Sequence, residues 1–125
     1  MRLVLALIQP TKVKPVQDAL AKIGVDRMTV CDSLGYGQQL GQFESRPLES
    51  RQPVEPGATE RPELLRKVAL EIVVNEDFLD RTVATITRVA RSGASGTIGD
   101  GKVFVLPVEE VVRLSDGVRG PEGVS

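Results

Sequence analysis

The sequence predicts an α+β protein in which an antiparallel sheet has two helices on one face. The first observation is the order of the elements: strand, helix, strand, a long irregular segment, and again strand, helix, strand. This βαββαβ order is typical of ferredoxin-like folds. The second observation is that residues 3–8, Leu-Val-Leu-Ala-Leu-Ile, are apolar on both faces of a strand. Because two helices cover only one face of such a sheet, we expect a partner subunit to cover the other.

The first half of the chain contains a strand, a helix and a second strand. Residues 3–8 form the first strand, and the helix follows within residues 11–25. Its apolar side chains recur at helical spacing, Pro15 fits the first turn, and Gly24 marks the end. Residues 28–34 alternate and are rich in β-branched side chains, which predicts the second strand.

The segment that follows the second strand shows no regular hydrophobic pattern. Four prolines interrupt it, and Glu and Arg alternate along it. A loop of this length inside a compact domain is normally either functional or disordered. Its polar composition leaves both interpretations open. We therefore predict a long loop from about residue 36 to residue 66.

The second half of the chain repeats the plan of the first. Residues 68–74 predict a third strand, and residues 76–91 predict an amphipathic helix. Asn75 is suited to cap that helix, and acidic residues occupy its first turn. A glycine-rich turn follows, and residues 102–107 predict a fourth strand.

The length and termini predict one domain with a short tail. A chain of 125 residues is the size of a single domain. We expect residues 1–115 to form the folded domain and residues 116–125, which are rich in Gly, to form a flexible C-terminal tail. The apolar run near Met1 is too short for a signal peptide, and no segment reaches transmembrane length.

The composition excludes several classes of protein. The 16 basic residues balance 17 acidic ones, so no overall field draws the chain to nucleic acid or to an anionic membrane. The sequence contains no histidine and one cysteine, Cys31. This excludes Ser-His and Cys-His catalysis, an internal disulfide, and a zinc site built from those residues. A single cysteine favours a reducing compartment, so we expect a cytoplasmic protein.

The stretch "GTIGDGKVFV" raises the clearest functional question. Its residues Gly99, Asp100, Gly101 and Lys102 suit an ordinary turn with a solvated lysine, which is the commoner meaning of so short a motif. They also suit an anion, since glycines let the backbone approach a ligand and lysine suits phosphate. A second cluster, "GYGQQLG" at residues 35–41, has neither the Rossmann nor the Walker spacing.

Three further charged residues have ordinary structural interpretations. Glu71 suits a charge at the edge or interface of the third strand, and Lys67 suits a residue that flanks the same strand. Arg113 suits a solvated position at the end of a strand. None of the three identifies a site on its own.

Five segments together resemble the PII signal-transduction family: "IQPTKVKPVQDALAKIGV", "MTV", "GYGQQLG", "KVALEIVV" and "TIGDGKVFVLPVEEVVRL". Their order and spacing extend the resemblance from Met1 to about Ser115, and "IGDGKVFV" is the most specific piece. The resemblance implies a ferredoxin-like homotrimer that binds an adenine nucleotide, ADP or ATP, in clefts between subunits. It also implies that a long loop, residues 38–66, contacts a target protein.

The resemblance also implies roles for individual residues, and none of them is catalytic. Positions that contact the nucleotide in the family match Gly35, Gly37, Gln38, Gln39, Gly99, Asp100, Gly101, Lys102 and Arg113. Positions around the adenine match Met28, Thr29, Glu71 and Val73. Positions used with magnesium and the effector 2-oxoglutarate match Gln39 and Lys67, so Gln39 is the residue expected near Mg²⁺.

The chain departs from the usual family pattern at several positions. Gln38 and Ser115 stand where the family usually has arginine, and Leu40 and Ala69 stand where it usually has lysine. The turn before the fourth strand is longer than in the family, near residues 93–95. The long loop lacks the "YRGAEY" segment, including the tyrosine that is uridylylated in some members. We therefore expect this chain's ligand preference and regulation to differ from those of a typical member.

The sequence thus predicts a non-enzymatic PII-like regulator that binds an adenine nucleotide and a small anionic metabolite. One alternative is a carbon-responsive regulator that couples ADP to bicarbonate, in place of a nitrogen sensor that responds to 2-oxoglutarate. Another is a small nucleotide phosphohydrolase, which the absence of histidine and of a carboxylate cluster disfavours. A third is a structural adaptor without a ligand.

Overall fold

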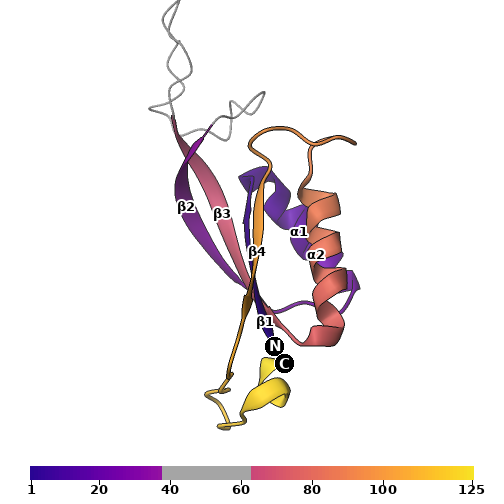
Figure 1. Ribbon diagram of the computed structural model, residues 1–125, viewed down its shortest axis with the longest axis vertical. Helices are drawn as coiled ribbons and strands as arrows, with labels where there is room; N and C mark the ends of the chain where they lie inside the picture. Colours follow the sequence, from indigo (N-terminus) through magenta and orange to yellow (C-terminus); the bar gives the residue numbers. More distant parts are fainter. Residues whose placement is uncertain (38–62) are drawn as a thin grey trace, which may run out of the picture.

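The computed structural model describes residues 1–37 and 63–125 (Figure 1). The described residues form a ferredoxin-like βαββαβ fold, as predicted. Its elements are β1 (Arg2–Ile8), a 3₁₀ turn η1 (Pro10–Lys12), α1 (Val13–Lys22), β2 (Thr29–Gly37), β3 (Glu63–Val74), α2 (Glu76–Ala90), β4 (Gly101–Pro107) and a 3₁₀ turn η4 (Gly120–Val124).

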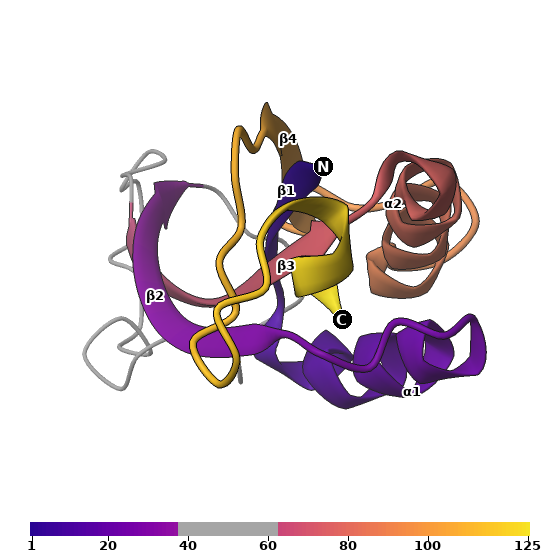
Figure 2. The same cartoon turned by 90° about the horizontal axis from the view of Figure 1, so that it is seen from below.

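The four strands form one sheet in the order β2-β3-β1-β4, and each neighbouring pair is antiparallel. β1 therefore lies inside the sheet, which agrees with its apolar sequence. The helices α1 and α2 lie side by side on one face of the sheet, while β2 and β3 curve away from them (Figure 2). This confirms the predicted arrangement of two helices on one face.

The hydrophobic core lies between the helices and the sheet. Alternate residues of β1 and β3 point into it, because successive side chains of a strand face opposite sides. The helices contribute the apolar stripes that their sequences predict. The most buried core residues are Val4, Ala6 and Ile8 of β1, Val68, Leu70, Ile72 and Val74 of β3, Val16 and Leu20 of α1, and Ile86 of α2.

The opposite side of the sheet, called here the open face, is also apolar. Leu3, Leu5 and Leu7 of β1 are only half-buried there. On β4 the side chains of Phe104 and Leu106, which pair with Leu5 and Leu3, remain 45% and 42% exposed. A single chain thus leaves an apolar surface uncovered, which is the feature that predicted a partner subunit.

The ladder between β2 and β3 extends further than the hydrophobic pattern indicates. β2 continues to Gly37 and β3 begins at Glu63, so both ends of the loop predicted for residues 36–66 are strand. Main-chain hydrogen bonds hold this extension, and such pairing needs no apolar alternation. The central part of that loop, including Gln38, Gln39 and Leu40, lies outside the described residues.

Asn75 stands at the N-cap of α2 as predicted, but its side chain makes no capping hydrogen bond. Its amide donates instead to the carbonyl of Pro121, at 3.2 Å. This contact ties the start of α2 to the C-terminal segment. Within the described part of the chain, Asn75 Oδ1 is buried without a hydrogen-bond partner.

The C-terminal segment, for which a flexible tail was predicted, has defined contacts in the structure. Val112 and Arg119 form an isolated antiparallel bridge, and Arg119 Nη2 lies 2.8 Å from Glu110 Oε2. η4 follows, and Gly123 within it is buried. This segment lies at the end of the sheet where both termini meet (Figure 1).

No helix among residues 1–37 and 63–125 is long and apolar enough to cross a membrane. The cytoplasmic location stays a prediction.

Candidate functional site

The glycine-rich turn before β4 is held in shape by the carboxylate of Asp100. Asp100 Oδ2 accepts hydrogen bonds from the main-chain N–H of Thr97 at 2.8 Å and of Ser92 at 3.0 Å. The main-chain N–H of Asp100 donates back to the carbonyl of Thr97 at 3.1 Å. Burial alone would raise the pKa of Asp100, but these hydrogen bonds outweigh it and lower the pKa below the ordinary carboxyl value. Asp100 therefore acts as a structural brace of the turn.

The glycines of this turn are required by its backbone. Gly99 and Gly101 have φ angles of +99° and +119°, a region that side chains with a Cβ rarely adopt. A Cβ on Gly101 would lie 1.8 Å from the carbonyl oxygen of Leu7. The ordinary interpretation of these glycines, a tight turn against β1, therefore holds whether or not the turn also binds a ligand.

Two side chains, one just after β1 and one within β3, hold the turn in place. The carbonyl of Gly99 accepts hydrogen bonds from the Gln9 amide, just after β1, and from Lys67 Nζ on β3. Partial burial lowers the pKa of Lys67, and the nearby charge of Asp100 only partly offsets this effect. The sequence indicated Lys67 but not Gln9, whose partner lies 90 positions away.

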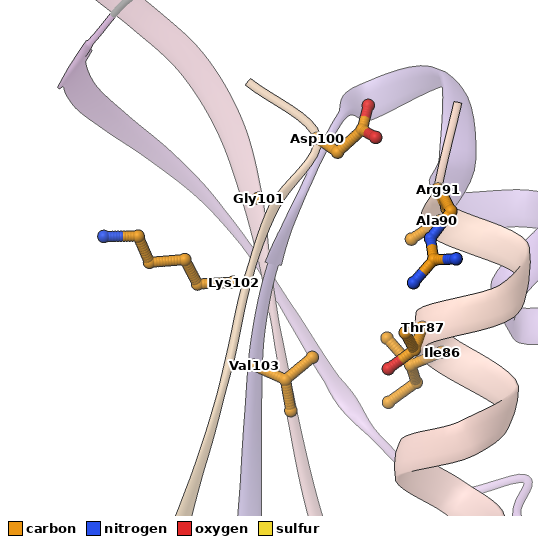
Figure 3. A pocket seen from close by; sticks show the side chains of 8 residues that line it. All are labelled: Ile86, Thr87, Ala90, Arg91, Asp100, Gly101, Lys102 and Val103. Atoms are coloured by element: carbon orange, nitrogen blue, oxygen red, sulfur yellow. The ribbon is translucent and has the colours of Figure 1, made fainter. Parts of the chain in front are cut away.

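Lys102 is the basic residue at the end of the turn. It pairs with Leu7 in the β1–β4 ladder, so its side chain lies on the open face, and it is exposed. Figure 3 shows it pointing away from a cavity of about 260 Å³ between α2 and β4, while Arg91 points into that cavity. Lys102 makes no ion pair within residues 1–37 and 63–125.

The residues predicted around the adenine lie on β2 and β3. Thr29 and Glu71 pair directly in the β2–β3 ladder and are both exposed on the open face. Val73 is half-buried on the same face. Met28 differs, because its side chain packs against the hydrophobic core on the helix side.

Arg113 is fully engaged by its own chain. Its Nε donates to Asp116 Oδ1 and Oδ2 at 3.0 and 3.1 Å, and its Nη2 donates to Asp116 Oδ2 at 2.7 Å. Its Nη1 donates to the carbonyl of Ser125 at 2.8 Å. The hydrogen bonds with Asp116 raise the pKa of Arg113, and the same pairing lowers the pKa of Asp116.

The predicted site residues fall into two groups that one chain does not bring together. Gly99 to Lys102 and Lys67 lie where β1 ends and β4 begins, and the backbones of Gly35 and Gly37 lie on β2 beyond Lys67. Arg113 follows Pro107, the last residue of β4, and the chain that follows β4 lies at the end of the sheet opposite the turn (Figure 1). The five residue-to-residue steps from Lys102 to Pro107 already span roughly 17 Å at about 3.3 Å per residue. One nucleotide that touches both Lys102 and Arg113 would therefore need two subunits.

Gln38 and Gln39 lie outside the described residues, so the structure does not place the residue expected near magnesium. Among the residues that it does describe, no group of three or more His, Cys, Asp or Glu side chains gathers as a metal site.

These features define a ferredoxin-like protein with a braced glycine turn, a long β2–β3 connection and an uncovered apolar face. A family model described as "Nitrogen regulatory protein P-II" matches residues 1–118. The nitrogen regulatory protein GlnK1 of Methanosarcina mazei is 39% identical over 124 residues, which cover 99% of this chain and 97% of that protein. Nitrogen regulatory protein P-II 1 of Escherichia coli K12 is 40% identical over 112 residues, which cover 90% and 89%.

A solved structure extends the similarity to three dimensions. The crystal structure of Arabidopsis thaliana PII bound to citrate matches with a TM-score of 0.70 at 32% sequence identity, over 98% of this chain and 88% of that one. The chain belongs to the P-II nitrogen regulatory protein family.

Family membership confirms the class of function that the sequence predicts. Members are non-catalytic signal-transduction proteins that bind ATP or ADP and 2-oxoglutarate and regulate partners in nitrogen metabolism through the long loop. They are homotrimers, an assembly that provides a cover for the open face. The phosphohydrolase alternative does not fit this family. The roles of individual residues and the identity of this chain's own effectors stay predictions.

Proposed function

We propose that this chain binds an adenine nucleotide with its phosphates on the Thr97–Lys102 turn of one subunit and its base beside Thr29 and Glu71 of the next. The observation that supports this most is the braced turn itself, which ends in an exposed lysine with no ion pair among the described residues. Because hydrogen bonds already hold the turn, little conformational entropy should be lost when a ligand binds. Lys102 supplies the charge that phosphate needs.

The arrangement of the two groups supports a site shared between subunits. The turn and Arg113 lie at opposite ends of β4, and the surface between them is the open face, where Phe104 and Leu106 remain uncovered. Packing a second copy against this face removes the apolar surface from water. The same packing can set the turn of one subunit against the β2–β3 ladder and Arg113 of another.

The proposal extends to the choice of nucleotide. Gln38 and Ser115 stand where the family resemblance leads us to expect arginine, and neither offers the planar fork of donors that binds outer phosphates. Lys102 remains for the inner phosphates. We therefore expect ADP, and even AMP, to bind at least as well as ATP.

The proposal extends also to the effector and the target. Lys67 lies beside the turn and is a suitable cation for a small dicarboxylate such as 2-oxoglutarate, with Gln39 and Mg²⁺ completing the contact. If ATP binds poorly, a contact that joins its last phosphate to 2-oxoglutarate through Mg²⁺ is weakened as well. ADP with bicarbonate is then the alternative pair of ligands. The loop of residues 38–66 then transmits the ligand state to a target protein.

Titration calorimetry tests the nucleotide and effector assignments together. ATP, ADP and AMP are titrated separately, each with and without 2-oxoglutarate plus Mg²⁺, and each with and without bicarbonate. We expect ADP to bind at least as tightly as ATP. Tight ATP binding that 2-oxoglutarate and Mg²⁺ strengthen, with bicarbonate inert, would contradict the ADP preference and indicate ordinary PII behaviour. Bicarbonate that strengthens ADP binding would favour the carbon-responsive alternative.

The phosphate role of the turn is tested by Lys102→Ala. Loss of one charge-assisted contact, worth roughly 1.5–3 kcal/mol, should weaken nucleotide binding about ten- to a hundredfold. Lys14→Ala is the matched control, because Lys14 is exposed on α1 and, among residues 1–37 and 63–125, pairs with Asp18 alone. Unchanged affinity in a folded Lys102→Ala protein would rule out the phosphate role of this lysine.

A further inference from the structure

We propose that Asp116 is a specificity-determining residue of the nucleotide site: it holds Arg113 as an internal counter-ion, so that an anionic ligand must displace a carboxylate of the protein itself. This inference rests on the proposed nucleotide site. It adds a residue that the sequence did not single out, and it explains why Arg113 need not favour the most highly charged ligand.

The geometry of the pair shows that Asp116 occupies the binding edge of Arg113. Nε and Nη2 both donate to the same carboxylate, with distances of 2.7 to 3.1 Å. This is the two-pronged contact that an arginine offers to a phosphate. Nη1 is also engaged, with the carbonyl of Ser125 at 2.8 Å and that of Glu122 at 3.4 Å. All three guanidinium nitrogens therefore have partners within the chain.

The carboxylate is held in place independently of Arg113's side chain. Asp116 Oδ1 accepts a hydrogen bond from the main-chain N–H of Val118 at 3.1 Å. The turn around it is closed by the N–H of Gly117, which donates to the carbonyl of Arg113 at 2.7 Å, and by the N–H of Arg113, which donates to the carbonyl of Val118 at 2.8 Å. The negative charge thus remains beside the arginine even when a ligand takes the guanidinium.

The pair is exposed enough to exchange with a ligand. The side chains of Arg113 and Asp116 retain 33% and 45% of their accessible surface. Ion pairs at such positions are weak, so a phosphate can replace the carboxylate. After replacement, the phosphate lies near the uncompensated charge of Asp116. This repulsion grows with the charge of the ligand, so Asp116 disfavours ATP more than ADP and ADP more than AMP.

The test is the affinity of Asp116→Asn for ATP, ADP and AMP, measured by calorimetry without magnesium so that the ligands differ in charge. Asparagine keeps an oxygen for the Val118 N–H but lacks the charge. We expect ATP to bind about five- to tenfold more tightly than to the unmodified protein, with smaller gains for ADP and the smallest for AMP. Asp116→Ser, which also keeps an acceptor, should give the same order.

The matched control is Glu110→Gln, which removes one negative charge from the same segment but from the partner of Arg119. It should change each affinity less than twofold. In a protein that also carries Arg113→Ala, Asp116→Asn should no longer change the affinity for any of the three nucleotides.

Three outcomes would overturn the inference. If the unmodified protein binds nucleotide and Asp116→Asn binds it no better, Asp116 does not compete and the proposed function stands. If Asp116→Asn binds more weakly, the carboxylate orients Arg113 for the ligand instead. If neither protein binds any nucleotide, the proposed function fails and this inference fails with it.

Discussion

Lys67 on β3 donates its side-chain hydrogen bond to the main-chain carbonyl of Gly99, in the turn that precedes β4, 32 positions further along the chain. The Gln9 amide donates to the same oxygen from the end of β1. One carbonyl therefore joins the turn to the two central strands of the sheet. A lysine that the family resemblance associates with an effector also holds the turn to which we assign the phosphates.

Replacing Lys67 should loosen the turn. Lys67→Met keeps the aliphatic stem but removes the donor, which should lower the free energy of unfolding by about 1–2 kcal/mol. The measurement is thermal unfolding at one fixed protein concentration, where roughly 4–8 °C would be lost. Lys14→Met, at an exposed position on α1, should change the melting temperature by much less. Equal effects of the two variants would show that the contact with Gly99 contributes nothing.

Gly101 should tolerate no side chain. Gly101→Ala places a Cβ 1.8 Å from the carbonyl oxygen of Leu7 at a φ of +119°, so we expect a loss of about 3 kcal/mol or more, or failure to fold. Gly93→Ala is the matched control in the same connection. Its φ is +68°, but no described atom lies within 4 Å of the added Cβ, so only about 1 kcal/mol should be lost. Similar stabilities of the two variants, measured by urea unfolding, would contradict the tight approach of the turn to β1.

The core contains a polar atom whose removal should stabilise the protein. Thr82 on α2 is fully buried, and within the described part of the chain its hydroxyl has no hydrogen-bond partner. Thr82→Val keeps the shape and removes the desolvated hydroxyl, which should add about 1 kcal/mol to the free energy of unfolding. Thr87→Val on the same helix should not stabilise, because Thr87 is exposed and already donates to the carbonyl of Val83 at 2.8 Å. A destabilised Thr82→Val protein would indicate a partner for that hydroxyl in solution.

The parts of the fold that depend on hydrophobic period were predictable from the sequence. The apolar runs of β1 and β3 and the apolar stripes of α1 and α2 are visible in the sequence, and they contain the core residues. The extension of β2 to Gly37 and of β3 to Glu63 was not predictable, because main-chain pairing at those positions leaves no hydrophobic pattern.

The same limit applies to the site. The Gly99–Lys102 motif is visible in the sequence, yet nothing local links it to Gln9 or shows that Asp100 braces the turn. The pairing of Arg113 with Asp116 had a local signal, since Asp116 and Gly117 form a typical turn dipeptide close to the arginine. The flexible tail predicted from residue 116 onward includes Asp116 but not Arg113, so the sequence prediction did not connect the two residues.

The brace formed by Asp100 should make the stability of the turn depend on pH at the acid end. Its hydrogen bonds from Ser92 and Thr97 favour the ionised carboxylate and lower the pKa of Asp100 in the folded protein relative to the unfolded chain. The unfolded chain then binds the proton more readily. The carboxylate therefore contributes its full stability above the ordinary carboxyl pKa, near pH 4, and loses that contribution as the pH falls through the lower folded value.

Two substitutions separate the charge of Asp100 from its role as an acceptor. Asp100→Ala removes the acceptor of two main-chain N–H groups and should cost about 1–3 kcal/mol at pH 7, measured by urea unfolding. Asp100→Asn keeps an acceptor oxygen and should cost less. Because asparagine does not titrate, the difference in stability between the unmodified protein and Asp100→Asn should be constant from pH 8 to about pH 5 and shrink below about pH 4. A difference that stays constant down to pH 3 would show that the charge of Asp100 does not stabilise the turn.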